Sequence, residues 1–218
     1  RVGSLVMLLG LVAAATGLAL LLGDSAIDRT VVGVLVDLVI VVGIYVFIGL
    51  TGVFSFGHLG FVAIGAYAVG LLTVPVGTKE VLFRSMPDAL DQLHLPFVPA
   101  LVVGGLVAAA AALVVAVPLS RMAGLTAALA TLSILVMVYT VASNWDQVTN
   151  GAQGMSGIPT NTTLGVAFAA ALVVITAVWL FQESRLGLQL RATREDPIAA
   201  RAVGIRVGRE RGIALVVS

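Results

Sequence analysis

Residues 31–50 read VVGVLVDLVIVVGIYVFIGL, twenty positions in which Asp37 is the only charged side chain. A helix of about 20 residues, rising about 1.5 Å per residue, crosses the roughly 30 Å hydrocarbon core of a bilayer. The whole chain has a similar character, since 60% of its 218 residues are hydrophobic and 11% are charged. Ordinary globular domains contain about 25% charged residues. The composition therefore excludes a water-soluble domain and indicates a protein embedded in lipid.

Six apolar runs are long enough to cross a bilayer. Membrane strands would show short segments of alternating polarity, so uninterrupted runs favour helices. We predict an all-α fold, a polytopic transmembrane helical bundle that forms a single domain over residues 1–218. The first run exceeds the apolar core of about 7–15 residues in a signal peptide, which favours a retained span. The spans are predicted at residues 2–23, 31–50, 59–77, 97–117, 122–143 and 164–181, with a partial seventh at 213–218.

The distribution of basic residues gives the orientation, because Lys and Arg near span ends stay in the cytoplasm. Seven of the twelve Lys and Arg residues lie between spans six and seven. With that segment inside, nine basic residues are cytoplasmic and three are outside, so the N-terminus is predicted to be cytoplasmic. The chain has no cysteine, which excludes disulfides and thiolate metal sites. It also lacks an initiator methionine, and we expect it to be part of a larger membrane domain.

Residues 182–212 carry eleven of the 23 charges and must face water. Within them, Pro197 and Gly204 predict a short amphipathic helix, because proline favours the first turn and glycine the end. Two interpretations remain open: a basic anchor for anionic lipid headgroups and a docking element for a cytosolic partner. Acidic side chains interleaved with the arginines favour docking, because a lipid anchor has no use for them. These acids are Glu183, Glu195, Asp196 and Glu210.

Three separated segments share the pattern of one transporter family. They are residues 49–58 (GLTGVFSFGH) with 65–67 (GAY), residues 144–159 (NWDQVTNGAQGMSGIP) and residues 184–204 (SRLGLQLRATREDPIAARAVG). In this order, over most of residues 40–218, they resemble the branched-chain amino acid ABC transporter permeases. The resemblance implies a multi-pass permease subunit of an ATP-driven importer in the bacterial inner membrane. Implied substrates are branched-chain amino acids or related small polar solutes, since relatives carry urea or short amides.

The resemblance also implies partners and a coupling element. Expected partners are ABC ATPase subunits, a second permease subunit, an extracytoplasmic solute-binding protein and membrane lipid, with no nucleic acid. The subunit itself is expected to be no enzyme and to hold no cofactor or metal. In such importers the loop at 182–212 carries a coupling helix that sits in a cleft of the ATPase, and Ile198 stands where the motif's name places Glu. We expect its displacement to rearrange spans five to seven. The implied coupling residues are Arg194, Glu195, Asp196, Ala199, Ala200 and Gly204.

Four residues are candidates for the translocation path. Asp37 lies about 10 Å from the outer end of its predicted span by helical rise, where an ionisable group suggests function; the alternative places it in the interface. Ser55 and His58 either supply hydrogen bonds along the path or belong to a simple cytoplasmic turn. Tyr45 stands where many relatives carry Asn, and Val136 and Tyr139 stand where many carry Glu and Arg. These departures leave fewer polar groups to hold a zwitterion.

The outer loop and two rival functions complete the prediction. By the resemblance, Asn144, Trp145 and Asp146 lie on the side that receives substrate from the binding protein; the alternative is an ordered turn. A rhomboid-type serine protease is a remote alternative, because both histidines precede Ser156 whereas such enzymes need a later one. A P-loop is excluded, since the sole lysine, Lys79, does not follow glycine. The closer alternative is a secondary transporter or channel, although the spans show no evident coupling-ion pair.

Overall fold

The computed structural model describes residues 2–83, 90, 92–122 and 124–218. Across these residues the regular elements are all helices, which confirms the all-α prediction. The chain divides into two compact units. Unit 1 contains Arg1–Gly52, Thr162–Ala214 and Ser218, and unit 2 contains Val53–Asn161 and Leu215–Val217.

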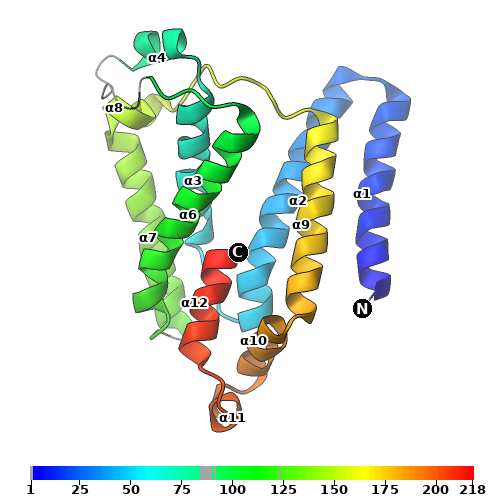
Figure 1. The fold of residues 1–218 in the computed structure, drawn as a ribbon, viewed down its shortest axis with the longest axis vertical. Coiled ribbons are helices and arrows are strands. Elements are labelled where there is room, and N and C mark those ends of the chain that lie inside the picture. The colour runs from blue at the N-terminus through cyan, green and yellow to red at the C-terminus, as the bar shows by residue number, and fades with distance from the viewer. Residues whose placement is uncertain (1, 84–89, 91, 123) are drawn as a thin grey trace. The chain divides into compact units, whose positions relative to one another are not determined.

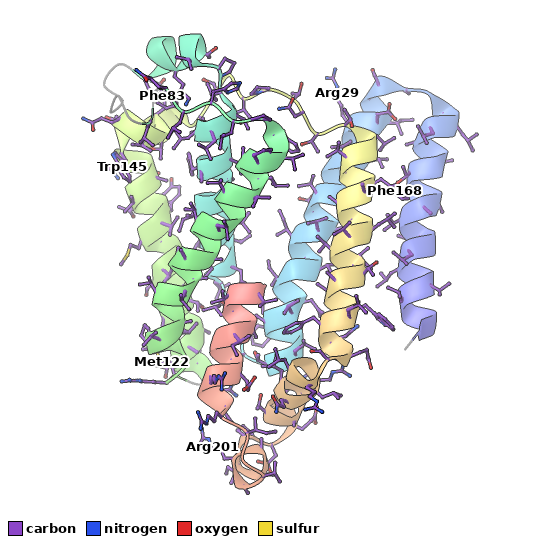
Figure 2. The ribbon with its side chains drawn as sticks, viewed as in Figure 1. Arg29, Phe83, Met122, Trp145, Phe168 and Arg201 are labelled. Carbon is purple, nitrogen blue, oxygen red and sulfur yellow. The ribbon has the colours of Figure 1, made fainter. Side chains whose placement is uncertain are left out.

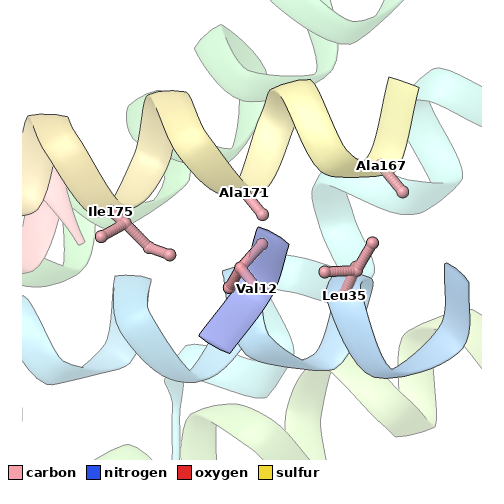
Figure 3. Close-up of a cluster of buried hydrophobic side chains, with 5 residues drawn as sticks. All are labelled: Val12, Leu35, Ala167, Ala171 and Ile175. Atoms are coloured by element: carbon pink, nitrogen blue, oxygen red, sulfur yellow. The ribbon is translucent and has the colours of Figure 1, made fainter. Parts of the chain in front are cut away.

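Unit 1 is built on three long helices and a chain of shorter ones (Figure 1). Helix α2 (Ser25–Thr51) packs along α9 (Leu164–Glu183), and α1 (Val2–Leu22) contacts both. Small side chains one turn apart on α9 let the helices approach closely. The shorter elements are α10 (Arg185–Glu195), α11 (Pro197–Ala202) and the first part of α12 (Val207–Val217), up to Ala214. The core between the long helices contains the buried residues Val12, Leu35, Ala167, Ala171 and Ile175 (Figure 3).

The two ends of unit 1 agree with the predicted orientation. The N-terminal end of α1 lies at the same end of the unit as α10 and α11 (Figure 1). Arg201 on α11 marks that end, and Arg29 near the start of α2 marks the other (Figure 2). The basic segment and the N-terminus are therefore on one side, as the distribution of Lys and Arg requires for a cytoplasmic N-terminus.

Unit 2 contains a short helix packed on two longer ones. Helix α3 (His58–Thr73) packs against α6 (Phe97–Leu119) and α7 (Gly124–Asn144). The approach to α6 is close, because a Cβ atom at Gly104 would lie 2.9 Å from the carbonyl oxygen of Gly65. Glycine is therefore required at this crossing. The remaining elements are α4 (Val76–Leu82), α8 (Asp146–Thr149) and η1 (Gly151–Gln153).

The sole lysine of the sequence is fully buried beneath the segment that leads to α6. The Lys79 ammonium group donates hydrogen bonds to the carbonyl oxygens of Leu90 (3.0 Å) and Leu93 (2.6 Å). Burial of an ammonium group is unfavourable unless its donors are satisfied. These contacts explain how Lys79 is accommodated and tie α4 to the segment after it.

The structure corrects some of the predicted span boundaries. Among the described residues, five helices are long and apolar enough to cross a membrane, and α3 is a shorter apolar helix. The prediction of a third span over 59–77 is wrong at its end: α3 stops at Thr73 because Pro75 lacks an N–H donor, and α4 follows. The second span begins at Ser25, where the Asp24 carboxylate accepts from the backbone N–H of Ala26 (2.9 Å). The partial seventh helix begins at Val207.

Candidate functional site

The charged segment between α9 and α12 folds into two short helices, of which the sequence predicted the second. Helix α10 starts after Ser184, whose hydroxyl accepts from the backbone N–H of Gly187 (3.3 Å) and donates to the carbonyl of Phe181 (2.5 Å). Leu190 and Thr193 are fully buried. The 182–212 segment is therefore partly anchored in unit 1 and is not a free loop.

Helix α11 confirms the predicted short helix. The Asp196 carboxylate accepts from the backbone N–H groups of Ile198 (2.8 Å) and Ala199 (3.0 Å), and Pro197 opens the first turn. Gly204 follows the helix in the left-handed region, at φ +87°. The backbone N–H of Ile205, next along the chain, returns to the carbonyl of Ala200 (3.0 Å). Local signals alone therefore define both ends of this helix.

The side chains of α11 divide into a buried base and an exposed surface. Ala200 is 3% exposed, whereas Ile198 is 79% and Val203 is 77% exposed. Arg201 is also exposed, and its side chain projects from the end of unit 1 (Figure 2). We call Ile198, Arg201 and Val203 the α11 tip. Of the other predicted coupling residues, Arg194, Glu195, Asp196, Ala199 and Gly204 are exposed.

Two arginines of α10 turn back onto the ends of long helices. The Arg194 guanidinium donates to the carbonyl oxygen of Gly49, near the end of α2, over 2.6 Å. The Arg191 guanidinium donates to the carbonyl of Gln182 and lies 3.4 Å from the Glu183 carboxylate, both at the end of α9. The carbonyls of a last helical turn lack intrahelical partners, and the negative end of the helix dipole favours a cation there.

The interleaved acids have different environments. Glu183 pairs with Arg191, Asp196 caps α11, and Glu195 is exposed. Glu210 on α12 is 8% exposed, and its Oε2 atom has no hydrogen-bond partner. The neighbouring Arg211 is partly buried. This burial, followed by the charge of Arg201, lowers the pKa of its guanidinium. Two of the four acids therefore stabilise the segment itself.

The predicted path residues fall into two pairs. Asp37 and Tyr45 share an exposed stripe of α2 with Val41, which lies four residues from each. Because α2 begins at Ser25, Asp37 lies about 18 Å along the helix by its rise. The helix therefore starts earlier than predicted, and the place of Asp37 relative to the membrane interface stays a prediction. A Cβ atom at Gly49 would collide with the Tyr45 ring, so the glycine gives that ring its position.

Ser55 and His58 form the second pair, in unit 2, and are 6% and 4% exposed. Their side chains share a hydrogen bond, His58 Nδ1 to Ser55 Oγ, of 2.8 Å. The adjacent backbone is held by Thr131 of α7, whose hydroxyl accepts from the N–H of Phe56 (3.1 Å) and donates to the carbonyl of Ala128 (2.8 Å). Sequence reasoning missed Thr131, since its only signal is a hydroxyl in an apolar span. A place in the path for Ser55 and His58 stays a prediction that requires a conformation in which they are uncovered.

The predicted outer-loop residues lie at the end of α7 and start of α8, where Asn144, Trp145 and Asp146 are exposed. Figure 2 shows Trp145 at this end of unit 2. The loop is ordered by its own contacts: the hydroxyl of Thr149 donates to the carbonyls of Ala142 (2.6 Å) and Trp145 (2.8 Å). The residues thus occupy an ordered turn that presents an exposed tryptophan. No cluster of metal-ligating side chains is present in the described part of the chain.

These features define a class, the multi-pass α-helical membrane proteins, here with a charged helical segment that follows the apolar helix α9. Within that class, residues 26–218 match the family described as branched-chain amino acid transport system / permease component. The chain belongs to this family, and the resemblance drawn from the three motifs is confirmed.

Two curated relatives extend the comparison. Both are named high-affinity branched-chain amino acid transport system permease protein LivM, one from Escherichia coli (strain K12) and one from Salmonella typhimurium (strain LT2). Each is 27% identical to this chain, with 84% of the chain and 47% of the relative covered. The chain thus spans about half the length of these relatives. No solved structure matches it significantly.

Proposed function

We propose that this chain forms the permease subunit of an ATP-driven ABC importer in the bacterial inner membrane. Its substrates are branched-chain amino acids or related small polar solutes. Its partners are ABC ATPase subunits, a second permease subunit and an extracytoplasmic solute-binding protein, and ATP is hydrolysed by the ATPases. Family membership supports the transport role, and the names of the two relatives support the substrate class.

The exposed α11 tip carries this proposal. Two large apolar side chains, Ile198 and Val203, lie uncovered beside Arg201 at the end of unit 1. Apolar side chains gathered on an otherwise charged, water-facing segment are typical of a contact with another protein. The base of the tip is fixed by buried Ala200 and by the cap that Asp196 provides. In the proposal, the tip docks on the ATPase subunit.

Helix α2 supports a solute path. An ionisable group within a span faces a partner helix or a water-filled cavity, because exposure of a carboxylate to lipid is unfavourable. We assign Asp37 to the path, where its carboxylate binds the ammonium group of the solute, and Tyr45 lies about two turns further along the same stripe. In the same proposal, Asn144, Trp145 and Asp146 contact the solute-binding protein on the opposite side of the membrane.

The docking role of the tip is tested with Ile198→Asp in the complex reconstituted in liposomes. We expect co-purification of the ATPase and ATP-dependent leucine uptake to fall about tenfold, the equivalent of about 1.4 kcal/mol. The midpoint of thermal unfolding should not change, because the side chain is exposed. Ile198→Leu is the matched control and should retain both properties. Uptake that continues without ATP and follows an ion gradient would identify a secondary transporter, and full activity of Ile198→Asp would show that the tip does not dock.

A further inference from the structure

Helix α10 connects two long helices that the sequence places far apart. Its Arg194 binds a carbonyl of α2, 145 residues away in the chain, and its Arg191 binds the last turn of α9. The two arginines are three positions apart and therefore lie next to each other on one face of the helix. Each guanidinium reaches a group that the end of an α-helix leaves without an intrahelical partner. We call Arg191 and Arg194 the two-arginine clamp.

Two glycines leave the space in which the two-arginine clamp packs. Gly52 ends α2 at φ +68°, and a Cβ atom there would lie 2.9 Å from Cγ of Arg194. Gly187 lies in the first turn of α10, where a Cβ atom would lie 2.5 Å from the carbonyl oxygen of Phe181. Because Gly52 has no side chain, the aliphatic part of Arg194 can pack against the end of α2. Because Gly187 has none, α10 can pack against the end of α9. Both contacts are thus fitted to glycine and leave no space for a larger residue.

The helices joined by the clamp already pack on each other. Leu35 of α2 lies in one buried cluster with Ala167, Ala171 and Ile175 of α9 (Figure 3). The attachment of α10 to α9 is also covalent, since Ser184 alone separates the two helices. Between α10 and α2, in contrast, there is no direct covalent connection, and Arg194 contributes a direct hydrogen bond to the carbonyl of Gly49. Removal of this one side chain should loosen α10 from α2 and leave its connection to α9 in place.

We infer that Arg194 is a positioning residue that makes α2, α9 and α10 move as one body when α11 is displaced. The inference rests on the proposed function for the source of that displacement, the ATPase subunit. It departs from the sequence-based expectation that the displacement acts on spans five to seven. The body that moves includes α2, and Asp37 and Tyr45 move with it. The glycine-rich end of α2 thereby provides the binding position for the Arg194 side chain.

The test combines a distance with a transport measurement. The chain has no cysteine, so Val36→Cys on α2, which lies off the stripe of Asp37 and Tyr45, and Leu188→Cys on α10, both exposed positions, carry two spin labels at defined sites. The distance between the labels is measured in the reconstituted complex, without nucleotide and with ATP and vanadate. In the same vesicles, leucine uptake per ATP hydrolysed is measured. The variants are Arg194→Ala, Gly52→Asn and the control Arg185→Ala.

The control removes one exposed arginine from the same helix, and no hydrogen bond of the Arg185 side chain is described. Gly52→Asn keeps every charge, tolerates the left-handed backbone and places a Cβ atom against the arginine stem. We expect one narrow distance that is the same in both nucleotide states for the parent and for Arg185→Ala. Arg194→Ala and Gly52→Asn should broaden the distance and reduce uptake per ATP about tenfold. If Arg194→Ala does not reach the membrane, Gly52→Asn decides the question.

Three outcomes would overturn the inference. A parent distance that changes between nucleotide states would show that α2 and α10 do not move together. Parent-like distances and uptake in both clamp variants would show that the contact has no role in coupling. Equal losses in Arg185→Ala and Arg194→Ala, with Gly52→Asn unaffected, would indicate lipid anchoring by total charge. Failure of the proposed function is distinct, because it would abolish ATP-dependent uptake in the parent while the label distance in the chain alone, in nanodiscs, still reports the clamp.

Discussion

The connection from α2 to α3 and the connection from α9 to α12 differ in the polar side chains that they contain and in what those side chains bind. Residues 53–57 carry no charge. Ser55 in the middle of this segment and His58 directly after it are buried and bonded to each other. Residues 184–206 are rich in charge, yet several of their charges also bind within unit 1. Arg191 and Arg194 hold helix ends, and Asp196 caps α11.

The difference lies in what each connection leaves uncovered. The charged connection leaves two large apolar side chains well exposed, Ile198 (79%) and Val203 (77%). Its charged side chains stabilise the fold of the segment and keep it in water. Its exposed apolar side chains are accessible for contact with another protein. In the neutral connection, the buried polar pair and Thr131 fix the backbone from inside. Charge in the sequence therefore predicts which connection faces water, but it does not predict which side chains are available for contact.

The largest effect is expected from a substitution in the first turn of α10, where the charged connection begins. In Gly187→Ala, the new Cβ atom would lie 2.5 Å from the carbonyl oxygen of Phe181 and 2.6 Å from Cα of Gln182. These are backbone atoms that cannot move aside, so we expect a loss of about 3 kcal/mol in stability, at the upper end for overpacking. The midpoint of thermal unfolding in detergent measures it. Gly165→Ala on α9, with open space around the position, should not lower the midpoint; equal losses in both would contradict the close contact.

An intermediate effect is expected in the neutral connection. Thr131→Val keeps the shape of the side chain but removes the acceptor of the partly buried Phe56 N–H. A buried donor left unpaired costs about 1–3 kcal/mol, and we expect the lower end of that range here. Thr140→Val on the same helix is the matched control, because that hydroxyl is exposed and bonds only within α7. The same unfolding measurement applies. Indistinguishable midpoints for the two variants would mean that Thr131 does not hold residues 53–57.

The smallest effect sharpens the role of charge in α11. Asp196→Ala removes the cap and should destabilise the helix locally by about 1 kcal/mol. Asp196→Asn keeps a side-chain oxygen and should retain most of that stability. Hydrogen exchange of the amides of Ala199–Ala202 distinguishes them, with faster exchange expected in the alanine variant alone. Equally fast exchange in the asparagine variant would show that the carboxylate charge, rather than the cap, is essential.

The parts of the fold that the sequence predicted depend on local signals. The long spans follow from apolar runs, and α11 follows from Pro197 and Gly204. Helix α10 was not predicted, although Ser184 as its N-cap and buried Leu190 and Thr193 are signals for it. The many charges around these residues suggested a loop. The end of α3 was misplaced because hydrophobicity continues past Pro75, whereas the backbone hydrogen bonds cannot.

The sequence predicted which residues belong to the candidate site, but it did not predict which residues they contact. The coupling residues came from the family pattern, and α11 has the expected form. The contact between Arg194 and Gly49 joins residues 145 positions apart, so no local pattern reveals it. The distance of Asp37 from the start of its helix was underestimated for a simpler reason. The polar residues before position 31 suggested a loop, yet Asp24 caps a helix that already begins at Ser25.

The short length of α3 has a consequence for how the protein meets the bilayer. Its 16 residues span about 24 Å, less than the roughly 30 Å hydrocarbon core. The residues at both of its ends are buried, since His58 is 4% and Thr73 is 3% exposed. The 23 residues of α6 span about 34 Å beside it. Hydrophobic mismatch in unit 2 is therefore set by α6 and α7, and adaptation to bilayers of different thickness falls to them.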